Sequence, residues 1–527
     1  MGRQGGEPEG AGEFTSEPIC ASVVAMAQKS YREWLPDQPY LLPPSPSEWL
    51  PTGHLAYFVM DVVGQLDLSK IEEEIQSKDP RGEKPYSPQM MTALLLYSYS
   101  TGRFSSRRIA RGTYDDVPLR VIAAGEHPHF TTINQFRLDH WDSLAALFEQ
   151  VYGMCLRVGM VRLGEVSLDG AKIKANASKH KAMSYQRMGE EERRLRAEVQ
   201  ALLQRGKDID EQEDALYGEG EDREDVPKEL ARREQRLQKL QAAKAELEKE
   251  AAVARAEGLR ELAAGQRARA KDEEVRQDER KRAEGRAKKH EEQAEALCPE
   301  PDEGPKDQLQ LPLNRVPCEP EGLPKPKAQR NFTDPESRIM VKDGAFVQSY
   351  NGQIVVDGEN QIIVAQGVSN QAPDAEYLVP MVERTLEVCK EAPEALLSDT
   401  GYFSEQNIEA LLAAGIEPFI AVGREKKADT AATTGEGTAA QKIRAEMAEK
   451  LKEGRGKEVY ARRKGTVEPV FGQIEEVRGF RRFSQRGLAK VRNEWAFVCL
   501  THNLIKLFRY TTAQGSMGRL SFVARGG

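Results

Sequence analysis

The chain has 527 residues, more than one ordinary domain holds, so we expect two or three folded units with a sizeable buried core. Hydrophobic residues make up 39%, charged residues 30% and aromatic residues 7%, which is typical of a soluble protein with a long polar helical part. No stretch approaches the roughly 18 uninterrupted apolar residues of a membrane span. The N-terminus lacks the basic and apolar segments of a secretory signal, so we predict a cytoplasmic protein.

Charge is distributed unevenly along the chain. The net charge of -8 argues against a nucleic-acid partner, but the stretch 452–492 holds 12 Lys or Arg and 5 Glu, a local charge of +7. Phosphate binding requires such a basic patch. Taken alone, the stretch fits a solvated charged helix face equally well.

The cysteines form no Cys-x-x-Cys pair, so neither a zinc site nor a disulfide framework is indicated. We expect reduced, structural thiols at Cys20, Cys155, Cys298, Cys318, Cys389 and Cys499.

Residues 1–60 are acidic and rich in Pro and Gly at the start, which predicts a flexible or extended lead. Residues 61–160 are predicted to form a helical domain. Its first clear helix covers 87–97 after a Ser cap, and others follow Ser105–Ser106 and Thr131–Thr132. A helix-turn-helix DNA reader and a plain bundle with exposed arginines both fit the spacing of Arg103, Arg107, Arg108 and Arg111.

Residues 165–174 alternate polar and apolar side chains, as a half-buried strand does. Residues 186–297 are rich in Glu, Arg, Lys, Gln and Ala with a break near 218–225, which predicts two long helices turning back on each other. A partial heptad seam favours a short antiparallel coiled-coil hairpin: Leu230, Leu237, Leu240 and Leu247. With the Pro-rich linker that follows, 186–330 form an insertion after the first strand.

Two β-rich runs, 345–357 and 361–368, are separated by GEN and predict a hairpin. Helix, strand, helix and strand then alternate. This order predicts an α/β fold with a five-stranded mixed sheet and flanking helices, formed by 161–185 and 331–510. A disordered tail is expected over 511–527.

Three acidic residues stand out by their positions. Asp169 lies within a strand, Asp399 closes the apolar run ALLS, and Glu468 lies in a predicted helix between basic segments. A buried acid is costly unless it is paired or bound to metal. Carboxylates converging on two magnesium ions could support DNA hydrolysis followed by strand transfer. Without further information, each acid is more simply explained as a structural cap or a surface group.

Four segments resemble the insertion-sequence DDE transposases, and nearest the insertion-sequence family numbered eleven eighty-two. They are LDGAKIKANASKHKAMSY (168–185), NFTDPESRIM (331–340), LLSDTGYFSEQNIEALLAAGI (396–416) and VEPVFGQIEEVRGFRRFSQRGLAKVRNEWAFVCLTHNLIKL (467–507). The resemblance covers about residues 60–185 and 330–510. It implies an RNase H-like catalytic domain in which Asp169, Asp399 and Glu468 bind two Mg2+ or Mn2+ ions, with Gly401 and Tyr402 beside the second Asp.

Two departures from the family pattern concern the region of Glu468. The broader group places a Tyr, then an Arg, before the catalytic Glu and a Lys seven residues after it. Here Tyr460 and Arg463 precede Glu468, but Arg463 is one residue too far away and Lys464 occupies the expected place. Glu475 stands where the Lys is expected. A carboxylate there would repel phosphate, so reduced activity is an expectation.

Further residues are candidates for DNA contacts, with solvated lysines and ordinary aromatic packing as the alternatives. They are Lys172, Lys174, Tyr402, Tyr460, Arg463, Lys464, Arg478, Arg481 and Arg482. His502 and Asn503 lie in an apolar helix and are predicted to be satisfied core polar groups. Caps or supporting groups are the simplest roles for Asp334, Asp374 and Glu376.

The resemblance predicts a DNA transposase that binds terminal inverted repeats and acts as a homodimer on double-stranded DNA. A catalytically weakened or inactive DNA-binding protein is the alternative that Glu475 favours. An interaction scaffold dominated by the helical insertion is a third hypothesis.

Overall fold

The computed structural model describes residues 45, 48–77, 84–217, 228–272, 275–298, 311–423 and 439–515. The lead predicted over 1–60, with Cys20, lies largely outside these residues, but a helix already begins at Leu55. The last helix continues to Ala513, inside the segment that we expected to be disordered, and residues 516–527 lie outside the described part. Within the described ranges, we find no helix with the length and apolar character of a membrane span.

The N-terminal part is helical, as predicted, but is divided more finely. Its helices are α1 (Leu55–Val63), α2 (Ser69–Gln76), α3 (Pro88–Ser100), α4 (Ser106–Asp115), α5 (Val117–Ile122), α6 (Phe130–Asp139) and α7 (Trp141–Arg157). α3 begins where the sequence predicts, because the Ser87 hydroxyl accepts a hydrogen bond from the backbone of Met90. The long helix predicted after Thr132 is interrupted at His140, whose φ of -113° and ψ of 23° are not helical.

These helices share one continuous core with the C-terminal helix α15 (Leu488–Ala513) rather than forming a separate bundle. Tyr99 of α3 packs edge-on against Phe497 of α15 with ring centroids 5.0 Å apart, and Trp141 of α7 lies beside the same ring. The buried Glu494 accepts hydrogen bonds from the backbone of Ser484 and Gln485. The predicted boundary near residue 160 is therefore a change of secondary structure within one core.

The described residues contain a mixed main sheet of six strands, one more than predicted. They are β1 (Glu165–Lys174), β4 (Arg338–Lys342), β5 (Ala345–Asp357), β6 (Ile363–Ser369), β7 (Ala395–Ser398) and β8 (Glu417–Ile420). The order is β4–β5–β1–β7–β8, and β6 also pairs with β5. β5 runs antiparallel to β1, whereas β7 and β8 run parallel to it. The additional strand is β4, which pairs with the first half of β5.

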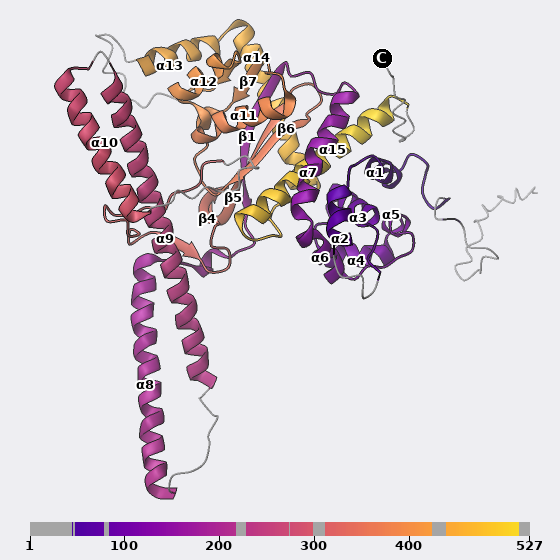
Figure 1. Ribbon diagram of the computed structural model, residues 1–527. Helices are drawn as coiled ribbons and strands as arrows, with labels where there is room; N and C mark the ends of the chain where they lie inside the picture. The colour runs from indigo at the N-terminus through magenta and orange to yellow at the C-terminus, as the bar shows by residue number, and fades with distance from the viewer. Residues whose placement is uncertain are drawn as a thin grey trace, which may run out of the picture. The chain divides into compact units, whose positions relative to one another are not determined.

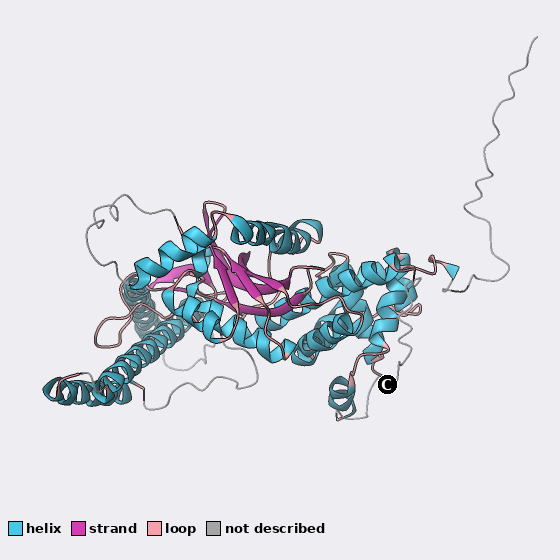
Figure 2. Cartoon of the chain, turned by 90° about the horizontal axis from the view of Figure 1, so that it is seen from above, coloured by secondary structure: helices cyan, strands magenta, loops and turns pink. Residues whose placement is uncertain are grey.

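Helices cover both faces of the main sheet (Figure 2). α11 (Leu378–Cys389) packs on one face together with α12 (Glu405–Ala413). α14 (Gly454–Gly472) and α15 pack on the other, and α13 (Ala439–Lys450) precedes α14. Two glycines mark the faces: a Cβ on Gly352 would meet Trp495 of α15, and one on Gly367 would meet Met381 of α11. The glycines allow both helices to approach the strands closely.

The insertion joins the rest of the chain through a two-stranded sheet of β2 (Ala182–Ser184) and β3 (Gln329–Asn331). Between these strands lie three helices, whereas we predicted two: α8 (Tyr185–Tyr217), α9 (Lys228–Lys271) and α10 (Gln277–Leu297). α9 packs against α8 along one part of its length and against α10 along another (Figure 1). The sequence between α9 and α10, residues 272–276, contains neither Gly nor Pro, so no helix-breaking residue predicts the end of α9.

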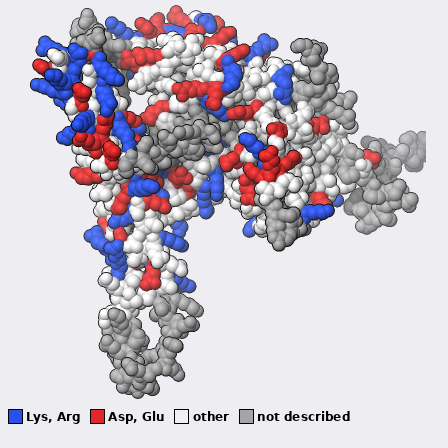
Figure 3. Space-filling model, in the orientation of Figure 1, with Lys and Arg blue, Asp and Glu red and all other residues white. Residues whose placement is uncertain are grey.

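The predicted leucine seam is present in the first of these hairpins. Leu240 and Leu247 of α9 are buried together with Met188 and Leu195 of α8. The second hairpin has a smaller seam, built around alanines of α10 and Leu259. Its surface carries both charge signs interspersed (Figure 3), as expected of solvated helices held by exposed ion pairs.

His502 and Asn503 are satisfied core polar groups, as predicted. The Asn503 side chain bonds both the N–H and the carbonyl of Ile363 in β6. His502 bonds the Gln473 side chain at 3.0 Å and the Gln361 carbonyl at 2.9 Å. Burial, followed by the charge of Arg478, lowers the pKa of His502 to about 3.

The buried His502 predicts a specific loss of stability in acid. Below pH 6.5 the unfolded chain protonates this ring while the folded state keeps it neutral, so stability falls as pH decreases from 6.5 towards 3. His502→Gln should flatten the dependence of the unfolding free energy on pH by up to about 1.4 kcal/mol per pH unit in this window, measured by urea unfolding. His180→Gln, at an exposed site, is the matched control. Equal slopes in wild type and His502→Gln would contradict the prediction.

Candidate functional site

Asp169 and Asp399 are brought side by side by the parallel pairing of β1 with β7. Ser167 lies opposite Leu397 in this pairing. Asp169 follows two residues later on β1, and Asp399 follows two residues later, directly after the end of β7. All four residues of β7 are buried, so the run ALLS fixes the strand and leaves Asp399 at its end. The register therefore sets the two carboxylates at the same level of neighbouring strands.

The Asp169 carboxylate is bound on both oxygens. The backbone N–H of Gly170 donates to Oδ1 at 2.8 Å, and the guanidinium of Arg463 donates to Oδ2 at 3.0 Å. Burial raises the pKa of Asp169, and the charge of Asp399 acts in the same direction, whereas Arg463 opposes it. Because Asp169 is largely buried, its negative charge is stable only beside a positive group such as Arg463.

Asp399 begins a short 3-10 turn over Thr400–Tyr402. Its Oδ1 accepts a hydrogen bond from the backbone N–H of Gly401 at 2.8 Å, as an N-cap does. This turn orients the carboxylate.

Glu468 lies apart from this pair of acids. The buried positions of α14 include Val459, Val467 and Val470, which face the sheet, whereas Glu468 is on the exposed side of the helix. Within the described ranges, no group of three or more His, Cys, Asp or Glu side chains is arranged to hold a metal ion. The structure therefore brings two of the three predicted acids together and leaves the third outside.

Arg463 occupies the position on α14 that faces the acids. Burial works against its charge, but Asp169, Tyr460 and Asp399 raise the pKa of Arg463. Tyr460, one helical turn earlier, faces the same acids. We had predicted DNA contacts for both residues. The spacing of Arg463 and Glu468 could have predicted that they do not face the same site. Two side chains five residues apart lie on different faces of a helix.

Two predicted DNA contacts are corrected by their burial, and a third is paired within the protein. The Tyr402 side chain lies inside the fold with 1% of its surface exposed, so it cannot stack on a base. Arg478 is 5% exposed and donates to the Val498 carbonyl and the Thr501 hydroxyl. Lys172 is ion-paired with Asp374 at 3.0 Å, with only 18% of its side chain exposed.

Most Lys and Arg side chains of the basic stretch 452–492 bind other groups of the protein. Nine of its 12 cations have an intramolecular partner: Lys452, Arg455, Arg462, Arg463, Arg478, Arg481, Arg482, Arg486 and Arg492. The exposed side chains of Lys457, Lys464 and Lys490 have no ion-pair or hydrogen-bond partner within the described part of the chain. Lys174 on β1 is exposed in the same way. The local charge of +7 therefore overstates the basic surface.

Glu475 does not stand as an unpaired carboxylate. It forms an ion pair with Lys342 of β4 at 2.6 Å, and both side chains are less than one fifth exposed. The pair joins a π-helical segment over Gln473–Val477 to the edge of the sheet. Glu475 thus makes a structural contact, and its effect on phosphate stays a prediction.

The arginines of the N-terminal helices are also partly engaged. Arg103 pairs with Asp116 and Arg111 with Asp115, whereas Arg107 lies 4.9 Å from the ring centre of Phe130. Arg107, Arg108 and Arg111 remain exposed on α4. This arrangement leaves both the DNA-reading and the plain-bundle interpretations open.

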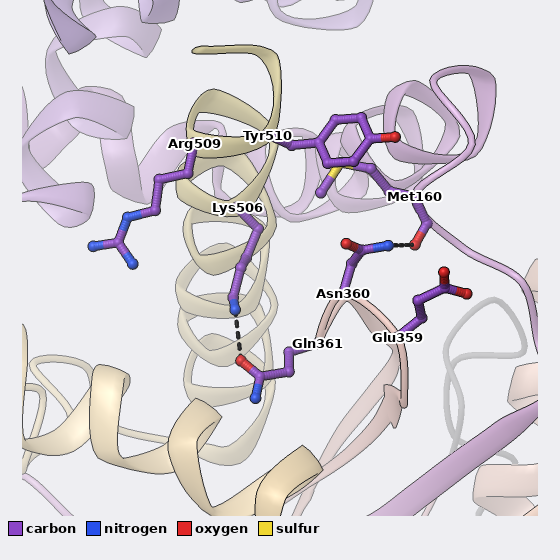
Figure 4. Close-up of a pocket in the computed structure, with 7 residues that line it drawn as sticks. All are labelled: Met160, Glu359, Asn360, Gln361, Lys506, Arg509 and Tyr510. Carbon is purple, nitrogen blue, oxygen red and sulfur yellow. Dashed lines mark hydrogen bonds between the residues drawn. The ribbon is translucent and has the colours of Figure 1, made fainter. Parts of the chain in front are cut away.

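A cavity of about 310 Å³ lies away from the acids, between the β5–β6 turn and the end of α15 (Figure 4). Lys506 points into it and donates to the Gln361 side chain at 2.6 Å, while Asn360 donates to the Met160 carbonyl. Arg509 points away from the other lining residues (Figure 4). None of the three predicted acids lines this cavity, so it is no part of the site.

Two protein-family models match the chain. One, described as a transposase DDE domain, matches residues 423–508, which contain α14 and Glu468. The other, described as a transposase domain, matches residues 44–139 in the N-terminal helices. Neither match includes Asp169 or Asp399. A search of curated proteins and a search of solved structures gave no match.

The pairing of Lys342 with Glu475 predicts the result of a charge reversal. Glu475→Lys should destabilise the fold by about 1 to 3 kcal/mol, because it leaves two half-buried ammonium groups facing each other. The double variant Lys342→Glu, Glu475→Lys should recover most of this loss in urea unfolding. Glu476→Lys, which breaks an exposed pair with Arg481, is the control and should cost less than about 1 kcal/mol. An equal loss in the single and double variants would contradict a direct pairing.

Proposed function

We propose that the chain is an insertion-sequence DDE transposase, which cuts DNA at the terminal inverted repeats of an element and joins the freed ends to target DNA. The match of residues 44–139 to a transposase domain and of residues 423–508 to a transposase DDE domain supports this proposal. The single observation that carries this chemistry is the adjacency of Asp169 and Asp399 on parallel strands. The order β6–β5–β1–β7–β8, with only β5 antiparallel to its neighbours, supports an RNase H-like catalytic domain.

The two neighbouring carboxylates suit a hard divalent cation. Mg2+ and Mn2+ prefer carboxylate oxygens, and a cation beside Asp169 and Asp399 would relieve the repulsion between them. These two residues would hold the metal, with Glu468 as the proposed third ligand. Two such ions, when bound, would activate the attacking oxygen and stabilise the leaving oxygen.

Arg463 and Glu468 lie on the same helix, and both would need to change place for three acids to meet. The guanidinium donates to the carboxylate oxygen of Asp169 that a metal would need. Pro469 and the π-helical segment after it interrupt the regular hydrogen bonding of α14 beside Glu468. This irregularity supports a turn of α14 that withdraws Arg463 and brings Glu468 to the acids when DNA binds.

Double-stranded DNA is the proposed partner. Lys174 and Lys464, with their exposed ammonium groups, would contact its phosphates, and Arg107 and Arg108 on α4 would extend the contact. Arg481 and Arg482 lie near the end of β1 and could join by exchanging their present partners. A homodimer is the proposed active complex, held by the helical insertion.

A second candidate function is that of a transposase-derived DNA-binding protein with weakened or no catalysis. The separation of Glu468 from Asp169 and Asp399 favours it, as does the occupation of Asp169 by Arg463. The two candidates differ in one measurable property, metal-dependent strand cleavage.

Replacing Asp399 tests the catalytic assignment. Asp399→Asn should abolish cleavage of a DNA fragment carrying the element ends in Mn2+, since it weakens one metal ligand, while DNA affinity changes by less than about twofold because no phosphate contact is lost. Asp343→Asn is the control, an exposed Asp in a left-handed turn that Asn also tolerates. Wild-type cleavage by Asp399→Asn would refute the assignment. Binding without cleavage by the wild-type protein would favour the second candidate.

Removing the insertion tests its role in assembly. Residues 186–297, which hold α8, α9 and α10, can be replaced by a flexible Gly-Ser linker that keeps Leu311 in the main core and the pairing of Ser184 with Gln329. The shortened protein should lose self-association in analytical ultracentrifugation and retain DNA binding. A shortened protein that still dimerises would assign the dimer contact to another surface.

A further inference from the structure

A buried polar network lies beneath Asp399, on the sheet face opposite α14. Asp374 accepts hydrogen bonds from Lys172 at 3.0 Å, from Asn351 at 2.7 Å and from Gln353 at 3.0 Å. The Tyr402 hydroxyl donates to the side-chain oxygen of Gln353. We call these five residues the polar network. They come from β1, β5, the 3-10 turn Ala375–Tyr377 that Asp374 caps, and the turn after β7.

The network is closed to solvent at its centre. Asn351 and Gln353 have no exposed surface, and Tyr402 is nearly as buried. Only Lys172 and Asp374, at the rim, remain about one fifth exposed. Such a satisfied buried network fixes the geometry of the elements it joins, because each donor and acceptor would be costly to leave unpaired.

Gly170, the residue after Asp169, makes room for this network. A Cβ at Gly170 would lie 2.1 Å from the side-chain nitrogen of Gln353, far inside van der Waals contact. Gln353 lies opposite Gly170 in the pairing of β1 with β5, so its side chain can pass over the strand only where β1 carries no side chain. The Asp169 side chain thus points to the sheet face that α14 covers. Gly170, which has no side chain, leaves space on the opposite face of the sheet.

The network reaches Asp399 through the turn that this acid begins. Tyr402 ends the 3-10 turn that Asp399 caps. Asn407 of α12 donates to the Tyr402 carbonyl and to the Ala375 carbonyl, both at 2.7 Å, and so ties this turn to the segment after Asp374. A Cβ at Gly401 would meet Asp399 and Asp374, which shows how closely the two segments approach.

We propose that Tyr402, Gln353, Asp374 and Lys172 are positioning residues that hold the Asp399 turn in the geometry needed for divalent metal. The proposal rests on the proposed function, in which Asp399 is a metal ligand. Residues that orient a ligand through hydrogen bonds typically change metal affinity by about 10 to 100-fold when they are replaced. The sequence predicted Lys172 and Tyr402 as DNA contacts. In this proposal they affect DNA cleavage indirectly, by orienting the Asp399 turn.

Tyr402→Phe is the first test, because it removes one hydroxyl and keeps the ring. The Mn2+ concentration for half-maximal cleavage should rise about 10-fold. Mn2+ binding is also measured without DNA, by the rise it causes in the thermal unfolding temperature. The Mn2+ concentration that gives half of this rise should increase by the same factor, while DNA affinity stays constant. We call these two half-maximal Mn2+ concentrations the metal midpoints. Tyr114→Phe, at an exposed tyrosine, is the matched control and should change none of these values.

Lys172 supplies a second test at the rim of the network. Lys172→Met leaves Asp374 without its cation and should raise both metal midpoints. Lys172→Arg keeps a cation at this position, so its metal midpoints should stay near the wild-type values. Lys174→Met, on the same strand and exposed, separates this effect from the loss of a surface charge, since it should weaken DNA binding without moving the metal midpoints. If Tyr402→Phe does not fold, the two Lys172 variants decide alone.

The outcomes separate this inference from the proposed function. Unchanged metal midpoints in folded Tyr402→Phe and Lys172→Met, with Asp399→Asn inactive, overturn the positioning role alone. Wild-type cleavage by Asp399→Asn overturns the proposed function and the inference with it. A loss of DNA affinity in Lys172→Met equal to that in Lys174→Met, with metal midpoints unmoved, assigns Lys172 to DNA contact and overturns its positioning role.

Discussion

Two carboxylates held on adjacent parallel strands repel each other, and the fold must supply positive charge beside them. Asp169 and Asp399 are fixed by the pairing of β1 with β7, which cannot relax without unpairing the centre of the sheet. In the described chain the compensating charge is the guanidinium of Arg463, delivered by α14 as it crosses the strands. The pKa of Asp169 is nevertheless raised, because burial outweighs this one cation. Within the described residues, Arg463 therefore compensates the charge of Asp169 only in part.

The two faces of the sheet serve the acids in different ways. On the α14 face, Asp169 is ion-paired with the guanidinium of Arg463. On the α11 face, a closed set of hydrogen bonds runs from Lys172 through Asp374 and Gln353 to Tyr402 and holds the turn of Asp399. Gly170 permits both arrangements within two residues of one strand. If Arg463 gives way to a metal ion as proposed, the hydrogen bonds on the α11 face would hold the Asp399 turn in place for that ion.

The local elements were predicted well where the sequence pattern is strong. The alternation over 165–174 and the β-rich run 345–357 coincide with β1 and β5, and the helices and strands after them follow in the predicted order. Fewer features could be predicted where the signal is non-local. No Gly or Pro precedes the third helix of the insertion over residues 272–276, and β4 overlaps a motif that we had not assigned to the sheet.

The exposure of charged side chains is the property that could be predicted least from the sequence. A count of Lys and Arg over 452–492 predicted a basic surface, but Arg478 is buried against Val498 and Thr501 and Arg462 is paired with Glu165. Whether a cation faces solvent depends on partners that lie far away in the chain, as Glu475 and Lys342 also do. No periodicity within one segment contains that information.

The sequence by itself determined five of the six strands of the main sheet and most helices, and it singled out three acids as candidates, because period-2 and period-3.6 patterns and motif residues are local properties of the chain. Only the tertiary structure decided which acids meet. The register of β1 with β7 joins Asp169 to Asp399, whereas the rotation of α14 about its axis directs Arg463 inward and Glu468 outward. The side chain that a helix presents to a sheet is set by the packing of its whole buried face, and that packing involves residues from every part of the fold.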